Sequence, residues 1–223
     1  SATLPQKRRF DLIKAYLGKK DMDENADWCN TAGYPLFTWT DGEQVCQKQM
    51  SLGVEKDIIQ VIRSKDEECM DILKNSLKDG GCAGIILNTV ARAQDFAQKL
   101  SECFPECEMI QMHSQFIISD RAEIEREILK RAGKNSIPEQ RNKLIIVGTQ
   151  VLEQSLDIDF DVMITDLCPM DLLLQRIGRE HRHKGRKRPL CLQKAKCYVL
   201  TETRVVYDKW LLQRTADKLP EYF

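Results

Sequence analysis

The stretch QRIGREHRH, residues 175 to 183, carries three arginines at three-residue intervals, Arg176, Arg179 and Arg182. Arginine is always charged and presents a rigid fork of donors, which suits phosphate oxygens or a phosphoryl group in transfer. On a helix this spacing brings the three side chains close to one face, and Gly178 leaves space beside them. The turn can therefore supply an arginine to a phosphoryl-transfer site from outside the nucleotide cradle. A solvated cationic helix end would show the same pattern.

A second stretch, GTQVLEQSLDID at residues 148 to 159, directly follows the most apolar run of the chain. Backbone donors and the Thr149 hydroxyl at a strand end suit a sugar-phosphate backbone, a contact that positions without reading sequence. Asp157 has the chemistry to accept a hydrogen bond from a ribose hydroxyl. An ordinary turn and cap would use the same residue types.

These residues must be placed by the elements around them. Short apolar runs alternate with stretches of helical period between residues 84 and 201, which is typical of βαβ units. We expect strands at residues 84–90, 108–113, 143–149, 161–166 and 196–202, hence an α/β fold with an open, mainly parallel sheet and helices on both faces. Ligands bind such sheets at the carboxyl ends of the strands. The positions there are Asn88, Thr89, His113, Gly148, Thr149, Gln150 and Asp166.

The chain divides into four expected segments: 1–20, 21–80, 81–203 and 204–223. The second is expected to be linker and edge elements, in which residues 36–40 and 54–62 pair as strands. The last has the apolar pattern of a helical extension, for which the sequence identifies no partner surface. If the chain is a piece of a longer protein, as its start at SATLP suggests, that partner is a domain outside this sequence.

The amino-acid composition limits the kinds of partner and the cellular compartment that the chain can have. Lys plus Arg and Asp plus Glu both number 34, so any basic site must be local. Nine cysteines without paired CxxC clusters indicate reduced thiols in a cytosolic protein. No apolar run approaches the roughly 20 residues of a membrane span, so we expect a soluble, cytoplasmic protein without a membrane partner.

Several other features have a plainer interpretation beside the functional one. The basic run HRHKGRKR, residues 181 to 188, either holds DNA phosphate or is a solvated loop. A zinc site from His181, His183, Cys191 and Cys197 is disfavoured by their spacing, and no metal site is predicted. His113 is either functional or a buried, hydrogen-bonded histidine. The tryptophans are expected to be packing residues.

The two stretches, taken in order, resemble motifs V and VI of superfamily 2 helicases. SATLP at residues 1 to 5 resembles motif III, and GIILNTVARAQ at residues 84 to 94 resembles motif IV. Four sequence segments are most similar to the CRISPR-associated helicase-nuclease family of type I interference: NTV.RAQ, MHSQF, TQVLEQSLDIDFD and QRIGR.HRH. The resemblance covers about residues 1–5 and 81–185.

The resemblance implies two RecA-like lobes with ATP and Mg²⁺ in the cleft between them and single-stranded DNA across their top. This chain would supply the second lobe, and residues 1–20 would end the first lobe and link the two. By similarity, Arg179 and Arg182 would reach the ATP γ-phosphate, with Gln175 and Arg176 in support and Asp157 contacting the sugar or coupling the lobes. Ser1, Ala2 and Thr3 would link hydrolysis to strand movement. The residues along the DNA backbone would be Asn88, Thr89, His113, Ser114, Thr149 and Gln150.

Two departures from the family pattern matter. Glu180 stands where the related motifs carry an apolar residue, and we expect its carboxylate to point to solvent. The sequence also holds no GxxxxGK[ST] phosphate loop, no DExH or DExD box and no His-Asp nuclease cluster. We therefore predict that this chain alone neither hydrolyses ATP nor cuts DNA, and that it acts with a first lobe, a nuclease domain and a CRISPR surveillance complex. The alternatives are a non-catalytic interaction module with the same fold, or a lobe of another superfamily 2 motor.

Overall fold

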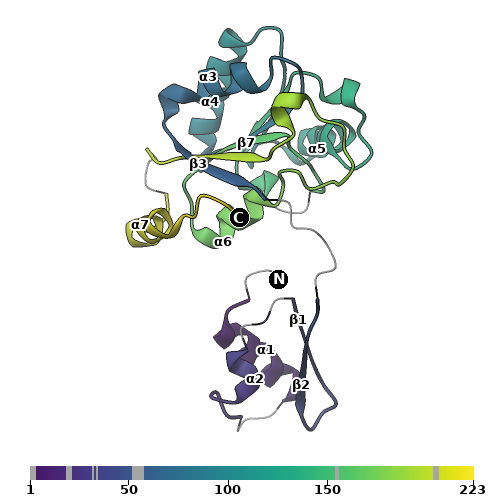
Figure 1. Ribbon diagram of the computed structural model, residues 1–223, viewed down its shortest axis with the longest axis vertical. Coiled ribbons are helices and arrows are strands. Elements are labelled where there is room, and N and C mark those ends of the chain that lie inside the picture. Colours follow the sequence, from purple (N-terminus) through teal and green to yellow (C-terminus); the bar gives the residue numbers. More distant parts are fainter. Residues whose placement is uncertain are drawn as a thin grey trace. The chain divides into compact units, whose positions relative to one another are not determined.

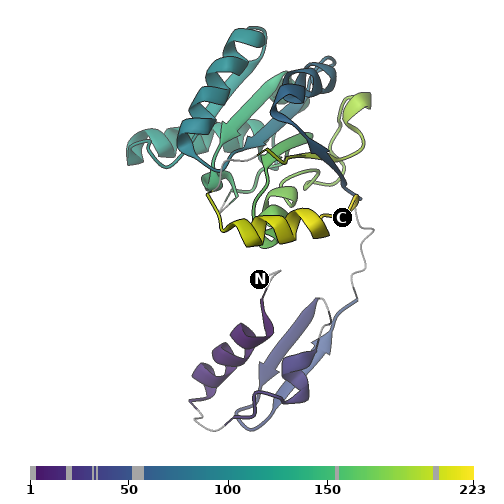
Figure 2. The same cartoon turned by 90° about the vertical axis from the view of Figure 1, so that its left-hand side faces the viewer.

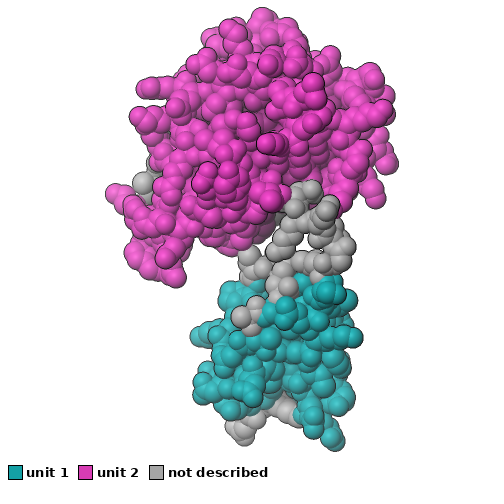
Figure 3. Space-filling view, viewed as in Figure 1, with its two compact units in different colours: residues 1–56 teal, residues 57–223 magenta. Residues whose placement is uncertain are grey.

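The computed structural model describes residues 4–18, 22–31, 33, 35–51, 58–153, 156–202 and 206–223. The chain forms two compact units, residues 1–56 and residues 57–223, which Figure 3 shows in teal and magenta. Residues 1 to 3, for which the sequence predicts motif III, lie outside the described part of the chain.

The smaller unit consists of helices α1 (Gln6–Leu17) and α2 (Asp27–Asn30) and a hairpin of strands β1 (Leu36–Thr40) and β2 (Val45–Gln49). Phe10 of α1 stacks on Trp28 of α2, with ring centroids 6.1 Å apart. The expected pairing of residues 36–40 with 54–62 is wrong, because β1 pairs antiparallel with β2 across a short turn. A local hairpin closes at a lower entropic cost than a pairing across a longer loop.

The larger unit contains a six-stranded sheet in the order β3-β8-β7-β4-β6-β5. All five neighbouring pairs are parallel, which confirms the predicted open parallel sheet. Five strands match the predicted runs, and the sixth, β3, lies at the edge. The strands are β3 (Gln60–Ser64), β4 (Cys82–Ile86), β5 (Glu108–Met112), β6 (Leu144–Gly148), β7 (Val162–Asp166) and β8 (Lys196–Leu200).

Helices cover both faces of this sheet (Figure 1). Helices α3 (Cys69–Ser76) and α4 (Val90–Cys103) pack on one face. Helices α5 (Ile118–Ala132), α6 (Met170–Ile177) and α7 (Lys209–Lys218) pack on the other. Short 3₁₀ turns complete the connections: η1 (Asp66–Glu68), η2 (Pro138–Arg141), η3 (Gln150–Leu152) and η4 (Leu190–Leu192).

The central strands are buried on both faces, and their side chains alternate between two cores. In β4, Cys82 and Ile86 belong to the core beneath α5 and α6, whereas Ala83 and Ile85 belong to the core beneath α3 and α4. This double burial explains why the strands read as continuous apolar runs.

The end of the chain packs on the edge strand β3. The backbone amide of Ile59 donates to the carbonyl of Phe223 at 3.0 Å, and the amide of Phe223 donates back to the carbonyl of Ile59 at 3.0 Å. Val61 donates to the carbonyl of Glu221 at 2.7 Å. Figure 2 shows α7 and the C-terminus along this side of the sheet. The C-terminal segment therefore has a partner surface within this chain, contrary to the sequence expectation.

Candidate functional site

The carboxyl ends of the parallel strands bring several predicted residues to one edge of the sheet. Asn88 and Thr89 follow β4, which lies between β7 and β6. Residues 149 and 150 follow β6, and His113 follows the edge strand β5. This placement follows from the parallel topology alone.

Arg176, on the last turn of α6, has no solvent-exposed surface. Its NH2 and Nε atoms lie 2.6 and 2.7 Å from Glu153 Oε1. NH1 donates to Thr165 Oγ1 at 2.8 Å, and NH2 donates to Asn88 Oδ1 at 3.0 Å. A buried guanidinium is tolerated only when it is paired and hydrogen-bonded, and Arg176 meets both conditions. It therefore supports the surrounding structure, because no atom of it reaches the surface.

Sequence reasoning missed Glu153, the acidic partner of Arg176. Its carboxylate is fully buried, and burial raises its pKa, an effect that the charge of Arg176 opposes. The main-chain carbonyl of Glu153 also accepts a 2.7 Å hydrogen bond from NH2 of Arg179. The signal in the sequence was a single carboxylate between apolar residues in VLEQSL, where Glu153 has no nearby partner in sequence.

Arg179 lies in the turn that follows α6, and not all donors of its guanidinium have partners. NH2 donates to the carbonyl of Glu153, while Nε is buried without a hydrogen-bond partner. Burial and the nearby charge of Arg182 lower the pKa of Arg179. Among the described residues no carboxylate side chain forms an ion pair with it. A cation held by one main-chain bond, with a donor still unpaired, is suited to binding an anion.

Arg182 lies three residues further on and is more exposed. Its Nε pairs with Asp157 Oδ1 at 2.9 Å, and Nε2 of His183 lies 3.0 Å from the same oxygen. The hydrogen bond from His183 and the charge of Arg182 hold the pKa of Asp157 below its usual range. The side chains of Arg182 and Asp157 are 40 and 51% exposed, so water screens this pair and its opening costs little.

The remaining predicted residues differ in how accessible they are. Gln175 is exposed on α6, and Ser114 is exposed after β5. Thr89 caps α4 by accepting a hydrogen bond from the amide of Arg92 at 3.2 Å. Thr149 is buried, and the side chain of Gln150 donates to the carbonyl of Asn88 at 3.0 Å.

His113 has the surroundings of a core histidine. Its ring stacks on Phe116 with centroids 4.3 Å apart, and its Nδ1 accepts from the amide of Gln115 at 3.3 Å. Burial lowers the pKa of His113. The side chain is nearly inaccessible, so the plainer of its two sequence interpretations describes the geometry.

Glu180 does not point to solvent, which corrects the expectation from the sequence. It is only 2% exposed, and its Oε1 accepts a 2.5 Å hydrogen bond from the amide of Lys196. The backbone at Glu180 forms a parallel bridge with Phe160. This bridge brings the chain leaving α6 alongside the strand lead-in to β7, which turns the carboxylate toward the start of β8. Burial raises the pKa of Glu180 well above its usual value.

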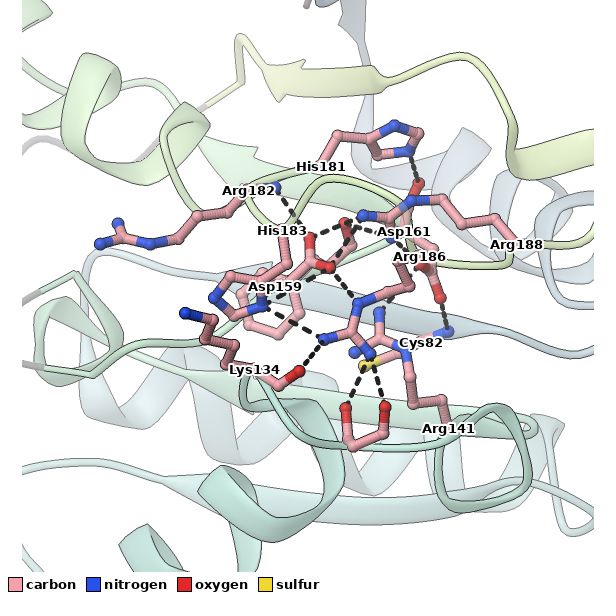
Figure 4. Close-up of polar contacts among 12 residues, drawn as sticks. Cys82, Lys134, Arg141, Asp159, Asp161, His181, Arg182, His183, Arg186 and Arg188 are labelled. Atoms are coloured by element: carbon pink, nitrogen blue, oxygen red, sulfur yellow. Dashed lines mark hydrogen bonds and ion pairs between the residues drawn. The ribbon is translucent and has the colours of Figure 1, made fainter.

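Part of the basic run 181–188 is used inside the fold, as Figure 4 shows. Arg186 Nε and Arg188 NH2 lie 2.5 and 2.8 Å from Asp159 Oδ2, and both arginine side chains are nearly buried. Arg141 pairs with Asp161 at 2.8 Å, and Arg188 also contacts Asp161. These pairs fasten the segment after Arg182 to the segment before β7. Arg186 and Arg188 therefore serve the fold, whereas Arg182 stays accessible.

No group of three or more potential ligands for a metal occurs among the described residues. Within that same part of the chain, no helix has the length and apolar character needed to cross a membrane.

The family model and a curated relative name the same family. The family model described as "CRISPR-associated nuclease/helicase Cas3, C-terminal" matches residues 79–185. A CRISPR-associated nuclease/helicase Cas3 of Streptococcus thermophilus is 45% identical over 99% of this chain and 25% of its own length.

Solved structures give the same result. The crystal structure of T. fusca Cas3-AMPPNP superposes with a TM-score of 0.86 at 31% identity, covering 97% of this chain and 28% of that one. A chain of a "CRISPR RNA-guided surveillance complex, pre-nicking" superposes with a TM-score of 0.80 at 28% identity, covering 97% of this chain and 30% of that one. The chain thus spans about a quarter of the length of these relatives, and the likeness confirms the RecA-like fold.

Proposed function

Because this chain belongs to the CRISPR-associated Cas3 nuclease/helicase family and corresponds to its C-terminal helicase lobe, we propose that it is one half of an ATP-dependent single-stranded-DNA translocase. In this proposal it works with a first helicase lobe, which carries the phosphate loop and the Mg²⁺ ligands. The pairing would hydrolyse ATP and pull DNA toward a nuclease domain.

The observation that carries the proposal is the set of contacts that the Arg179 guanidinium makes and leaves unmade. Its guanidinium is oriented by the carbonyl of Glu153, has no carboxylate partner among the described residues and keeps a buried, unpaired Nε. A preoriented cation in a partly dry site stabilises charge that develops on a transferring phosphoryl group, since little reorganisation is needed. We assign to Arg179 the role of arginine finger.

Arg182 would be the second cation at the γ-phosphate. In this structure it is paired with Asp157, so the pair must open or pivot for Arg182 to reach a nucleotide. The exposure of both side chains makes this change inexpensive. Asp157 would then be free to accept from the ribose, and the exposed Gln175 would border the same face.

The proposed ligands and partners follow the relatives. One relative is a Cas3 with AMPPNP and another belongs to a surveillance complex, which supports ATP as the nucleotide and such a complex as the recruiting partner. Mg²⁺ would come with ATP. Thr89 and Ser114 are the residues whose hydroxyl groups remain best placed for DNA phosphate, and Thr149 and Gln150 would line the same edge. We place the protein in the cytoplasm.

The test uses the two-lobe protein that contains this chain. Arg179→Ala should lower the DNA-stimulated ATP turnover number by roughly 10³-fold or more, the range found for arginine fingers. The matched control is Arg126→Ala on α5, whose side chain is 75% exposed and contacts Glu123 and the carbonyl of Ala122 on its own helix; it should leave turnover unchanged.

A non-catalytic interaction module would respond differently. It would show no DNA-stimulated turnover that depends on Arg179, while recruitment to a surveillance complex would persist in both variants. The chain by itself should show no ATP turnover with or without DNA, and measurable turnover by the pure chain would contradict this proposal.

A further inference from the structure

Asn88 lies where the predicted DNA-contacting edge meets the arginine-bearing helix, and all its polar groups have partners. Its amide donates to Asp166 Oδ2 at 2.8 Å, and its side-chain Nδ2 donates to the carbonyl of Leu167 at 2.9 Å. Its Oδ1 accepts from Arg176 NH2 at 3.0 Å, and its carbonyl accepts from Gln150 at 3.0 Å. Asn88 is therefore bound on every side within the fold.

The orientation of the Asn88 amide follows from the chemistry of its partners. Arg176 can only donate, so the atom facing it must be Oδ1, and the carbonyl of Leu167 can only accept, so the atom facing it must be Nδ2. The residue is 4% exposed. Nδ2 donates one of its two hydrogens to Leu167, and with so little of the residue exposed, a DNA phosphate has little access to the second hydrogen.

From Asn88 a continuous path of contacts, buried as far as Glu153, leads to Arg179. Arg176 bridges Asn88 Oδ1 and Glu153 Oε1, and it has no exposed surface. Glu153 then links Arg176 to Arg179, because its carboxylate contacts Arg176 and its main-chain carbonyl accepts from Arg179 NH2. The end of β4, the loop after β6 and the turn after α6 are thus fixed to one another by three hydrogen-bonded links.

We propose that Asn88 is a positioning residue: by fixing Arg176 and, through it, Glu153, it sets the place of Arg179 at the nucleotide, and it does not contact DNA. The proposal rests on the proposed function, since it concerns the same ATP site. It reassigns Asn88 from the DNA track to the support of the arginine finger. The neighbouring Thr89, whose hydroxyl faces the start of α4, stays on the DNA side.

Two kinetic constants of the two-lobe protein separate these roles. A DNA contact governs the DNA concentration for half-maximal ATP turnover, whereas support of Arg179 governs kcat at saturating DNA. Asn88→Ala removes one of the acceptors of Arg176, and a misplaced catalytic group costs on the order of 10- to 100-fold in rate. We expect kcat at saturating DNA to fall by that factor, with the half-maximal DNA concentration changed less than about threefold.

Asn88→Asp is the discriminating variant. Its carboxylate still accepts from Arg176, but its second oxygen faces the carbonyl of Leu167 and loses the hydrogen bond that Nδ2 makes there. We therefore expect kcat to recover in part, to above that of Asn88→Ala. If Asn88 contacted a phosphate instead, the added negative charge would weaken DNA binding further than alanine does. Should Asn88→Ala fail to fold, this variant alone decides, because a positioning role leaves the half-maximal DNA concentration within about threefold, whereas a phosphate contact predicts a clear rise.

Ser114→Ala is the matched control for a true DNA-side residue, since Ser114 is exposed at the same edge of the sheet. It should raise the half-maximal DNA concentration and leave kcat unchanged. The proposal is overturned if Asn88→Ala behaves like Ser114→Ala, or if neither constant changes. Failure of the underlying function looks different: in that case Arg179→Ala itself would not reduce DNA-stimulated turnover.

Discussion

Glu180 is a carboxylate that folding removes from water. One oxygen accepts from the amide of Lys196, and the other, Oε2, is buried without a partner. Burial raises its pKa well above 4.5, the ordinary value, although the charge of Arg188 acts in the opposite direction. The folded protein therefore retains this proton to a higher pH than the unfolded chain does. At pH values between the pKa of Glu180 in the unfolded chain and its pKa in the folded protein, the folded state binds more protons than the unfolded state. The stability of the folded state therefore falls as the pH rises through this range.

Glu180→Gln should remove this pH dependence. The amide oxygen can still accept from Lys196, and the side chain cannot ionise. We expect the variant to gain stability relative to the original chain as the pH rises from 5 to 8, by about 1 kcal/mol or more, the equivalent of one pKa unit. Urea unfolding of both chains at the two pH values measures the difference. Glu123→Gln, at a side chain that is 76% exposed, should give the same difference at both pH values; equal behaviour of the two variants would disprove the argument.

Strand β4 depends on a close approach by an aromatic ring. A Cβ atom added at Gly84 would lie 2.3 to 2.5 Å from three ring carbons of Phe160. Phe160 is fully buried in the core beneath α5 and α6, and its backbone connects the lead-in of β7 to the turn that carries Arg179. The contact between β4 and Phe160 therefore links the centre of the sheet to the proposed arginine finger.

Gly84→Ala should destabilise the larger unit by about 1–3 kcal/mol, the usual cost of overpacking a core. Urea unfolding measures the loss. Phe160→Leu in the same chain should restore part of the stability, because it vacates the space that the added methyl group needs. The double variant should then be more stable than the sum of the two single changes predicts. Strict additivity would show that the ring does not press on this glycine.

The parts of this fold that sequence could predict are those with a local signature. Strands β4 and β6 are buried on both faces, so their apolar runs stand out. The strand expected at residues 54–62 overlaps the edge strand β3, but its partner was predicted wrongly, because β3 pairs with β8, which is far away in sequence. The carboxyl-edge residues followed from strand order, but the Asn88, Arg176 and Glu153 contacts join segments far apart in sequence. Nothing in the local pattern of Glu180 distinguishes a buried carboxylate from an exposed one.

On the scale of the whole molecule, the first and last residues of the larger unit pair with each other at the edge of the sheet. Ile59 and Val61 exchange three backbone hydrogen bonds with Glu221 and Phe223. Leu219, just after α7, is buried in the same core as Ile59. Edge strands present unpaired backbone groups that invite association with other chains. The C-terminal residues cover the outer side of β3 and thereby remove part of that edge.

Deleting residues 219–223 should therefore destabilise the larger unit and promote its association. Loss of three hydrogen bonds at about 1 kcal/mol each and of one buried leucine at about 1.5–3 kcal/mol predicts a decrease of about 4.5–6 kcal/mol in the free energy of unfolding. Urea unfolding and light scattering of residues 58–223 and 58–218 measure both effects. A chain of residues 58–223 should unfold with the stability of the larger unit in the complete chain, because the smaller unit is a separate compact body. If residues 58–218 proved equally stable and monomeric, the C-terminal residues would be an appendage, and β3 would need no cover to hold the edge of the sheet.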